Sequence, residues 1–447
     1  MLSKSYSYAL VCSVMLLGAC GGQEAGTAVS RTRVNADVTS QTTNPLGNVE
    51  PHSQGSAQGG TVAPSAAPSP AITSEIAQVN PVETTYQNSR GNLVSRVRLP
   101  MVPEYMGKIP DTGVTASQCY GAGGTALISC TSAAAIALNP QQDGMIGRDV
   151  TDSSSVDGQL GFSYSTVANS AGGMYDKTEC VKDDITGLTW EGKTASGVHS
   201  KFTYYTYAQA AAFVADTNVS KLCGFEDWRL PTAVELQSLV DYGVASGDPA
   251  VLTPAIDRTW FPNTQDSYYL SSSAVFGTAL VVGFSDGWTR GDSSTLFYVR
   301  LVRGAKITTS FVVSADGQEV TDTKAGLIWR RCAEGATFNG STCIGSTETG
   351  GTSYSHEPAF AQAKTQAIAT GLAWRLPNIK ELANLSADLA GYTVAFPGAP
   401  EWLWSSTPQA GDPYSAWTVQ RSGSVDASLG NRTVNTYIRM RLVRNAP

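Results

Sequence analysis

The chain has 447 residues, of which 42% are hydrophobic and only 15% are charged, with a formal net charge of −7. The hydrophobic share is sufficient for packed cores, whereas the acidic balance argues against a nucleic-acid-binding protein, which would present a basic surface. A histidine-built zinc site or a histidine-dependent catalytic triad is not expected, because the only histidines are His52, His199 and His356.

The first residues, Met1–Ala19, predict a secretory signal peptide, since one early cation precedes an apolar run and a small-residue cleavage site. The ending Leu17-Gly18-Ala19-Cys20 resembles the lipobox of bacterial lipoproteins. That resemblance implies cleavage before Cys20 and attachment of lipid to its thiol; the alternative is an ordinary signal with an incidental cysteine. We therefore expect a protein of the cell envelope, in the outer membrane or at the cell surface, that contacts the membrane through its lipid anchor only.

A long polar linker follows the anchor. Residues 20–90 are dominated by Gly, Ser, Thr, Ala, Gln, Asn and Pro, and they contain no aromatic residue before Tyr86. Such a composition cannot bury enough apolar surface to offset backbone entropy, so disorder is predicted, with a reach on the order of 45–50 Å. Residues 91–174 then form a lead-in segment before the main folded part.

The cysteines indicate an oxidising compartment. Without Cys12 of the signal peptide and the lipidated Cys20, an even number of cysteines remains, which in an exported chain predicts disulfides. Six cysteines allow 15 pairings. The simplest local pairing joins Cys119 with Cys130, Cys180 with Cys223, and Cys332 with Cys343.

An internal repeat is the most informative property of the remaining chain. Four markers occur twice in the same order, 134 to 146 residues apart. They are Gly187-Leu188-Thr189-Trp190 with Gly326-Leu327-Ile328-Trp329, Trp228-Arg229-Leu230-Pro231 with Trp374-Arg375-Leu376-Pro377, Ser271-Ser272 with Ser405-Ser406, and Val299–Arg303 with Met440–Arg444. We therefore predict two tandem domains, repeat 1 (residues 175–305) and repeat 2 (residues 306–447), each of which should fold as a separate unit.

Each repeat predicts two helices and several short strands. Thr232 with Glu235, and Asn378 with Glu381, have the spacing of capping boxes that begin a helix. Alanine-rich stretches upstream, 207–214 and 358–369, predict the other helix of each repeat. Short apolar or alternating runs predict antiparallel strands over 278–284, 299–303, 414–419 and 440–444. The expected fold class is α+β, with two tandem domains behind a disordered tether.

These motifs together resemble the Lcl C-terminal domain family, formerly a domain of unknown function. The resemblance covers about 176–304 and 314–445, and the lead-in around Cys119 and Cys130 resembles segments that precede such domains. It implies a C-type-lectin-like fold, similar also to formylglycine-generating enzymes. Some similar proteins are surface adhesins that bind sulfated glycosaminoglycans, and others are variable receptors of diversity-generating retroelements.

The repeated Trp and Arg residues are interpreted as structural. Both copies keep them at matching offsets while other loops differ, as expected for residues that the fold requires. Arg229 has Glu235 or Asp227 as candidate partners, and Arg375 has Glu381. A ligand-binding role, in which Trp stacks on a sugar and Arg holds a carboxylate, is the less favoured alternative.

No enzymatic site is expected. The redox cysteines that formylglycine-generating enzymes use late in the domain have no counterpart, because no cysteine follows Cys343. No cofactor is expected, and no metal site either, since Asp183-Asp184 and Asp286-Gly287 are more typical of turns or caps than of calcium ligands.

The expected function is adhesion or ligand recognition at the cell surface, with a glycan, including sulfated polysaccharide, or a protein as partner. Repeat 1 has 10 Lys+Arg against 15 Asp+Glu, while repeat 2 has 12 against 11, so repeat 2 tolerates a polyanion better. The candidate ligand-binding residues are Trp402, Tyr414, Trp417, Arg421, Asn431, Arg432, Asn435 and Arg439. The alternatives are a non-catalytic structural or protein-interaction lipoprotein of the envelope and, more distantly, an uncharacterised hydrolase.

Overall fold

The computed structural model describes residues 83–87, 93–97, 109–151, 154–245, 253–275, 277–345, 351–427, 431–433 and 438–447. The expected signal peptide, Cys20 and most of the linker lie outside these residues. All described residues belong to one compact unit, Glu75–Pro447. Strands β1 (Glu83–Gln87) and β2 (Leu93–Val97) pair with each other, which differs from the expectation of disorder up to residue 90.

Repeat 1 contains a four-stranded sheet, two helices and a three-stranded segment of a larger sheet. The four-stranded sheet has the order β11-β7-β6-β5, and its strand β5 is contributed by the lead-in segment. The elements are β5 (Tyr164–Thr166), β6 (Cys180–Asp183), β7 (Thr189–Glu191), α3 (Tyr207–Ser220), η2 (Leu222–Gly224), α4 (Ala233–Ser238), β8 (Tyr268–Val275), β9 (Thr278–Gly283), β10 (Thr289–Gly291) and β11 (Val302–Arg303).

Repeat 2 has the same plan with a small additional hairpin and helix. Its four-stranded sheet has the order β12-β13-β14-β20, so the last strand closes the sheet as β11 does in repeat 1. The elements are β12 (Phe311–Val313), β13 (Glu319–Asp322), β14 (Leu327–Arg330), β15 (Ala336–Phe338), β16 (Cys343–Gly345), α5 (His356–Thr370), α6 (Ile379–Asn384), η3 (Leu385–Asp388), α7 (Leu389–Ala395), β17 (Trp402–Gln409), β18 (Asp412–Gln420), β19 (Val425–Asp426) and β20 (Val443–Asn445).

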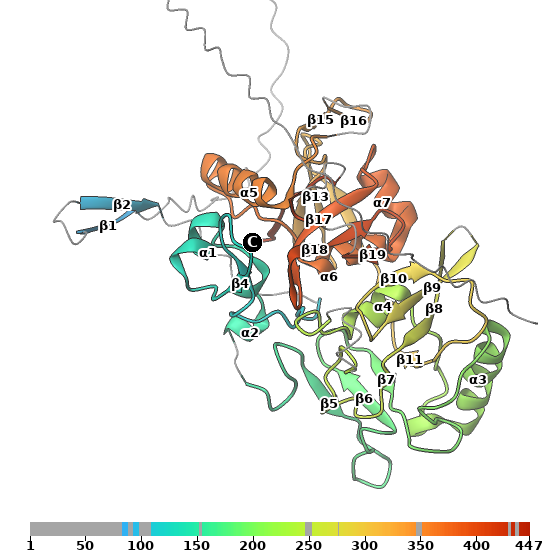
Figure 1. Cartoon of the computed structure of the whole chain (residues 1–447). Helices are drawn as coiled ribbons and strands as arrows, with labels where there is room; N and C mark the ends of the chain where they lie inside the picture. The colour runs from blue at the N-terminus through green and yellow to red at the C-terminus, as the bar shows by residue number, and fades with distance from the viewer. Residues whose placement is uncertain are drawn as a thin grey trace, which may run out of the picture. The chain divides into compact units, whose positions relative to one another are not determined.

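One six-stranded sheet runs through both repeats. Its order is β17-β18-β19-β10-β9-β8, and the central pair β10 and β19 is antiparallel through Thr289 and Val425 (Figure 1). Equivalent strands follow in the same order from either end, so the repeats meet as the two halves of a pseudo-symmetric dimer do. Helices α4 and α6 also pack together. A single hydrophobic cluster contains Leu236 and Trp190 of repeat 1 together with Leu382 and Trp329 of repeat 2.

The middle of the lead-in segment packs on repeat 2, although it precedes repeat 1 in the chain. Figure 1 shows its helix α1 beside α5. The Asn139 side chain donates to the Phe360 carbonyl at 3.0 Å, and the Tyr120 hydroxyl donates to the Ser415 carbonyl at 2.6 Å. Its elements are β3 (Cys119–Tyr120), β4 (Leu127–Ile128), α1 (Ala133–Leu138), η1 (Asp143–Met145) and α2 (Arg148–Thr151).

Both predicted capping boxes are confirmed. The Thr232 hydroxyl accepts from the Glu235 amide at 3.2 Å, and the Asn378 side chain accepts from the Glu381 amide at 2.9 Å. Each Glu side chain reaches back to the amide of its cap residue. These reciprocal bonds satisfy amides at the start of a short helix that would otherwise lack partners.

The structure confirms an α+β protein in which the named strands of the described residues pair antiparallel. The three disulfides are those expected, Cys119–Cys130, Cys180–Cys223 and Cys332–Cys343. The C-type-lectin-like assignment and the domain boundaries stay predictions. The shared sheet and core, however, do not fit the expectation that each repeat folds on its own.

We expect a fragment of residues 310–447 to fold poorly by itself. It would lose the partner strand of β19, the helix α4 that covers α6, and the lead-in segment that covers α5. The predicted result is a species that binds the dye ANS and lacks near-UV circular dichroism, compared with residues 109–447 as the control. Cooperative urea unfolding of the fragment with a native near-UV spectrum would contradict this prediction.

Candidate functional site

The repeated tryptophans are core residues, as predicted. Trp190, Trp228, Trp329 and Trp374 are all buried, and none presents a ring face to solvent. Trp404 in the Ser-Ser marker is buried as well, and its indole donates to the Tyr354 carbonyl at 2.8 Å. These side chains therefore build the hydrophobic clusters of the fold rather than a sugar-stacking surface.

Each repeated Trp-Arg-Leu-Pro motif holds a bidentate ion pair. The two terminal nitrogens of the Arg229 guanidinium each donate to one Glu235 carboxylate oxygen at 2.7 Å. The two terminal nitrogens of Arg375 donate to the Glu381 carboxylate in the same way, also at 2.7 Å. The sequence left Glu235 and Asp227 as alternatives for Arg229; Asp227 instead accepts from Arg303 at 2.7 Å. Since each Glu also caps its helix, the pair joins the motif to the helix that follows it.

The two ion pairs offer a matched test of burial. The Arg375 side chain is 2% exposed, whereas the Arg229 side chain is 20% exposed. Arg375→Met would leave the Glu381 carboxylate buried without its partner, which typically costs about 3–5 kcal/mol of folding stability. We expect Arg229→Met to cost about as much, although Arg229 is the more exposed arginine, because the Glu235 carboxylate left without its partner is itself 0% exposed. Urea denaturation of both variants measures the two losses, and a much smaller loss for Arg229→Met would contradict the prediction.

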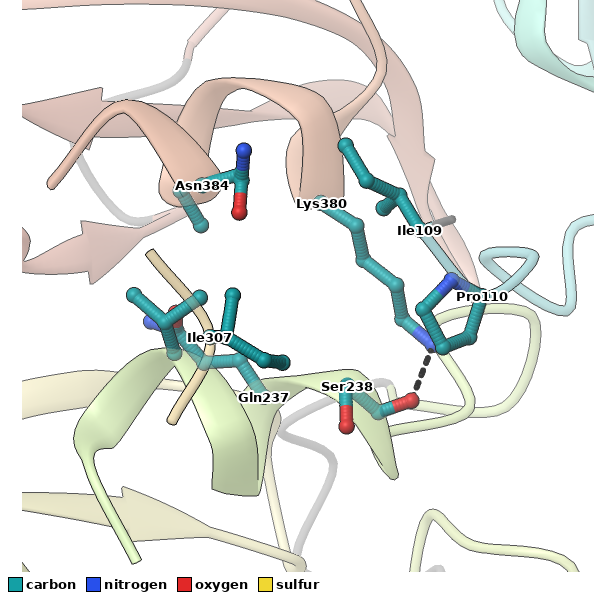
Figure 2. A pocket seen from close by; sticks show the side chains of 9 residues that line it. Ile109, Pro110, Gln237, Ser238, Ile307, Lys380 and Asn384 are labelled. Carbon is teal, nitrogen blue, oxygen red and sulfur yellow. Dashed lines mark hydrogen bonds between the residues drawn. The ribbon is translucent and has the colours of Figure 1, made fainter. Parts of the chain in front are cut away.

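A buried lysine stands where the lead-in and both repeats meet. Lys380 of α6 donates to the Asp111 carbonyl at 2.6 Å and to the Ser238 carbonyl at 2.8 Å (Figure 2). The matching position of α4 is Val234, so this contact is not duplicated. Beside it lies a cavity of about 20 Å³, room for about one water molecule. The cavity lies between packed elements and is too small to hold a substrate.

Buried carboxylates surround this junction. The Asp143 carboxylate accepts from the Thr407 hydroxyl at 2.6 Å and from the Thr112 hydroxyl at 3.1 Å. Burial raises the pKa of Asp143 to about 8 and that of Asp241 to about 7, despite these and other hydrogen bonds. Burial lowers the pKa of Lys380 to about 7. Loss of solvent thus disfavours the charged forms of both the acids and the lysine.

These shifts predict how pH acts on stability. Because the pKa of Asp143 rises on folding, the folded chain binds more protons than the unfolded chain between about pH 4 and 8, so its stability falls as pH rises. Asp143→Asn removes this group and keeps a hydrogen-bond acceptor. Relative to that variant, the wild type should lose up to about 1.4 kcal/mol per pH unit across the window. Urea midpoints that change in parallel with pH would contradict the prediction.

The candidate ligand-binding residues of repeat 2 are only partly at the surface. Tyr414 and Arg421 are exposed, while Trp402, Asn431 and Arg439 are half-buried. Trp417 is 0% exposed and packs edge-on against Tyr242 of repeat 1, so the expectation that it stacks on a ligand is wrong. Asn435 lies outside the described residues.

Arg432 is also misassigned, because it is 5% exposed and holds the lead-in segment in place. Its guanidinium lies 3.6 Å from the Tyr120 ring centroid, and its Nε donates to His356 at 3.1 Å. The other arginines of this region are engaged as well. Arg441 donates to the Arg330 carbonyl at 2.7 Å, and Arg444 pairs with Glu319 at 2.7 Å. The excess positive charge is therefore not gathered into one free anion-binding surface.

Repeat 1 has an aromatic surface that was not predicted from the sequence. Phe202, Tyr204 and Tyr207 are all more than half exposed, and so are Val198 and Leu296. They lie on the segment before α3, on the first residue of α3 and on the segment after β10. The segments before α3 and after β10 are joined by hydrogen bonds between the backbones of Tyr205 and Phe297. The sequence signal for this surface is the run of aromatic residues in Phe-Thr-Tyr-Tyr-Thr-Tyr at 202–207. We call Val198, Phe202, Tyr204, Tyr207 and Leu296 the open face of repeat 1.

Within the described residues, no group of three or more His, Cys, Asp or Glu side chains is placed to hold a metal ion. In the same part of the chain, none of the helices has the length and apolar character needed to cross a bilayer.

The architecture and the buried repeated motifs define a protein of two fused α+β units whose shared residues serve the fold. The sequence model of the Lcl C-terminal domain matches residues 179–303 and 318–444, more than half of the chain. The chain belongs to the Lcl C-terminal domain family and contains that domain twice in tandem. No curated protein matches the sequence. At the level that family membership supports, this is at most a surface or interaction protein.

Proposed function

We propose that this protein is a lipid-anchored recognition protein of the cell envelope, whose folded head binds a glycan or protein ligand without catalysing a reaction. One observation carries the proposal: the residues that the two repeats share lie in cores and ion pairs, while their exposed side chains differ. A duplicated scaffold with divergent surfaces suits ligand recognition better than shared chemistry.

The surface chemistry supports binding through apolar and aromatic contacts more than through charge. The open face presents three aromatic rings. In contrast, the guanidinium of Arg421, the exposed arginine among the candidates of repeat 2, already lies 3.9 Å from the Glu401 carboxylate. Exposed aromatic rings are common to sugar-binding and protein-binding surfaces. The net charges of the repeats suggested a sulfated polysaccharide as ligand, but the exposed side chains favour it less.

A glycan-array screen of residues 109–447 tests the recognition function, with Tyr414→Ala and Arg421→Glu as surface variants that leave the core intact. A hit that these variants weaken would assign the ligand to repeat 2. Charge-dependent binding should also weaken steeply as salt increases. If no glycan on the array binds, the ligand that remains under this proposal is a protein.

The anchor is tested at Cys20. Cys20→Ser should abolish lipid attachment, so that the head is released as soluble protein or accumulates as an uncut precursor. Detergent partitioning and intact mass measure both outcomes, with Cys12→Ser as the matched control that leaves lipidation unchanged. A Cys20→Ser protein that still partitions into detergent with the mass of a lipidated chain would refute the anchor.

A further inference from the structure

We propose that the open face of repeat 1 binds a polypeptide partner that covers it as the lead-in segment covers repeat 2. This inference rests on the proposed recognition function and names its site and the kind of partner. Its basis is the internal duplication, because the chain itself shows how one copy of this surface is used.

In repeat 2, the start of α5 is covered by the disulfide-closed lead-in segment. The Tyr120 ring meets the His356 ring nearly edge-on, with centroids 5.2 Å apart, and His356 is 0% exposed. Helix α1 lies along α5, where the Lys364 ammonium donates to the Ala137 carbonyl at 2.7 Å. The Gly123 amide donates to the Glu357 carboxylate at 3.0 Å. A polypeptide therefore fills this surface with one aromatic ring, a short helix and backbone amides.

Repeat 1 builds the same surroundings with the same backbone connections. The Tyr205 amide donates to the Phe297 carbonyl at 2.9 Å, and the Tyr354 amide donates to the Ile438 carbonyl at 3.1 Å. In each repeat the next residue is the N-cap of the helix, Thr206 or Ser355. Tyr207 of α3 thus takes the position of His356 of α5, as the first residue of the helix.

The two repeats differ in whether another segment covers the start of this helix. Tyr207 is 57% exposed and Phe202 is 62% exposed, and the ammonium of the adjacent Lys201 lies 5.1 Å from the Phe202 ring centroid. The outer side of α3 continues this surface with Ala208, Ala211, Ala212 and Ala215, all exposed. A solvated helix normally carries charged residues on its outer side, yet Asp216 is the single charged residue of α3.

The face is held in one conformation from behind, which suits a preformed binding surface. The Tyr204 ring lies tilted against Tyr298, with ring centroids 4.3 Å apart, and their hydroxyls are 2.7 Å apart. The Tyr205 ring lies against Phe213 of α3, in the cluster that contains the Cys180–Cys223 disulfide. Little ordering of side chains is then needed when a partner binds.

A polypeptide is favoured over a glycan because the covered copy shows polypeptide chemistry at this place. Tyr and Phe are enriched at protein interfaces, and an alanine-lined helix allows close approach of a partner backbone but offers few polar groups to a sugar. The partner segment should be apolar, with an aromatic or aliphatic side chain, and neutral or basic overall, since repeat 1 has 10 Lys+Arg against 15 Asp+Glu.

Site-specific photo-crosslinking in cells that make the full chain tests the proposal. The photoreactive residue p-benzoylphenylalanine replaces Phe202 or Tyr207 and, as controls of similar exposure on repeat 2, Val312 or Val394. We expect the same discrete protein adduct at 202 and 207 and none at 312 and 394. Adding Tyr204→Ala and Leu296→Ala to the chain labelled at 207 should reduce the adduct at least several-fold, while far-UV circular dichroism and cooperative urea unfolding are retained.

The other outcomes overturn the inference in distinguishable ways. An adduct with the mass of two copies of this chain would show self-association instead of a partner, and an adduct removed by glycosidases would show a glycan. Protein adducts only at positions 312 or 394 would move the site to repeat 2 and leave the recognition function standing. No adduct at any position, together with a blank glycan array, would overturn both the site and the function.

Discussion

The antiparallel contact between β10 and β19 is the interaction on which the rest of the structure depends. It merges two three-stranded segments into one sheet and brings α4 against α6 beneath it. Each of these strands is very short, so neither would be a stable sheet edge in isolation. Once they are joined, the apolar sides of both repeats face one core, and the buried junction around Lys380 follows from that arrangement.

The duplicated units have become unequal by small changes at equivalent positions. Lys380 replaces the aliphatic Val234, and it donates to carbonyls of both neighbouring parts of the chain. Such a buried amine adds less to stability than a well-packed apolar residue, but it fixes which surfaces meet, because only two carbonyl groups satisfy it. His356 and Tyr207 differ for a related reason: one lies beneath the lead-in segment and the other faces solvent.

Much of the fold could be predicted from the sequence because local signals carry it. The capping boxes at Thr232 and Asn378, the alanine-rich helices and the nearest-neighbour disulfides depend on residues close together in the chain. The site was harder, since it depends on contacts between distant segments. Trp417 and Arg432 had the composition of a binding surface, but Tyr242 of repeat 1 and Tyr120 of the lead-in segment cover them. No spacing in the sequence indicates which surface another segment will cover.

The path of the lead-in segment has a consequence for how the chain acquires its structure. Residues made before repeat 1 have their partners in repeat 2, as in the bonds from Lys380 to Asp111 and from Tyr120 to Ser415, 269 and 295 residues apart. During synthesis, these parts of the early segment must therefore wait until nearly the whole chain has emerged, and such distant contacts slow folding. The final strand β20, which ends at Asn445, pairs with β14 and completes the repeat 2 sheet. A chain cut short by a few residues would thus leave β14 without this partner strand and open the repeat 2 sheet to proteases.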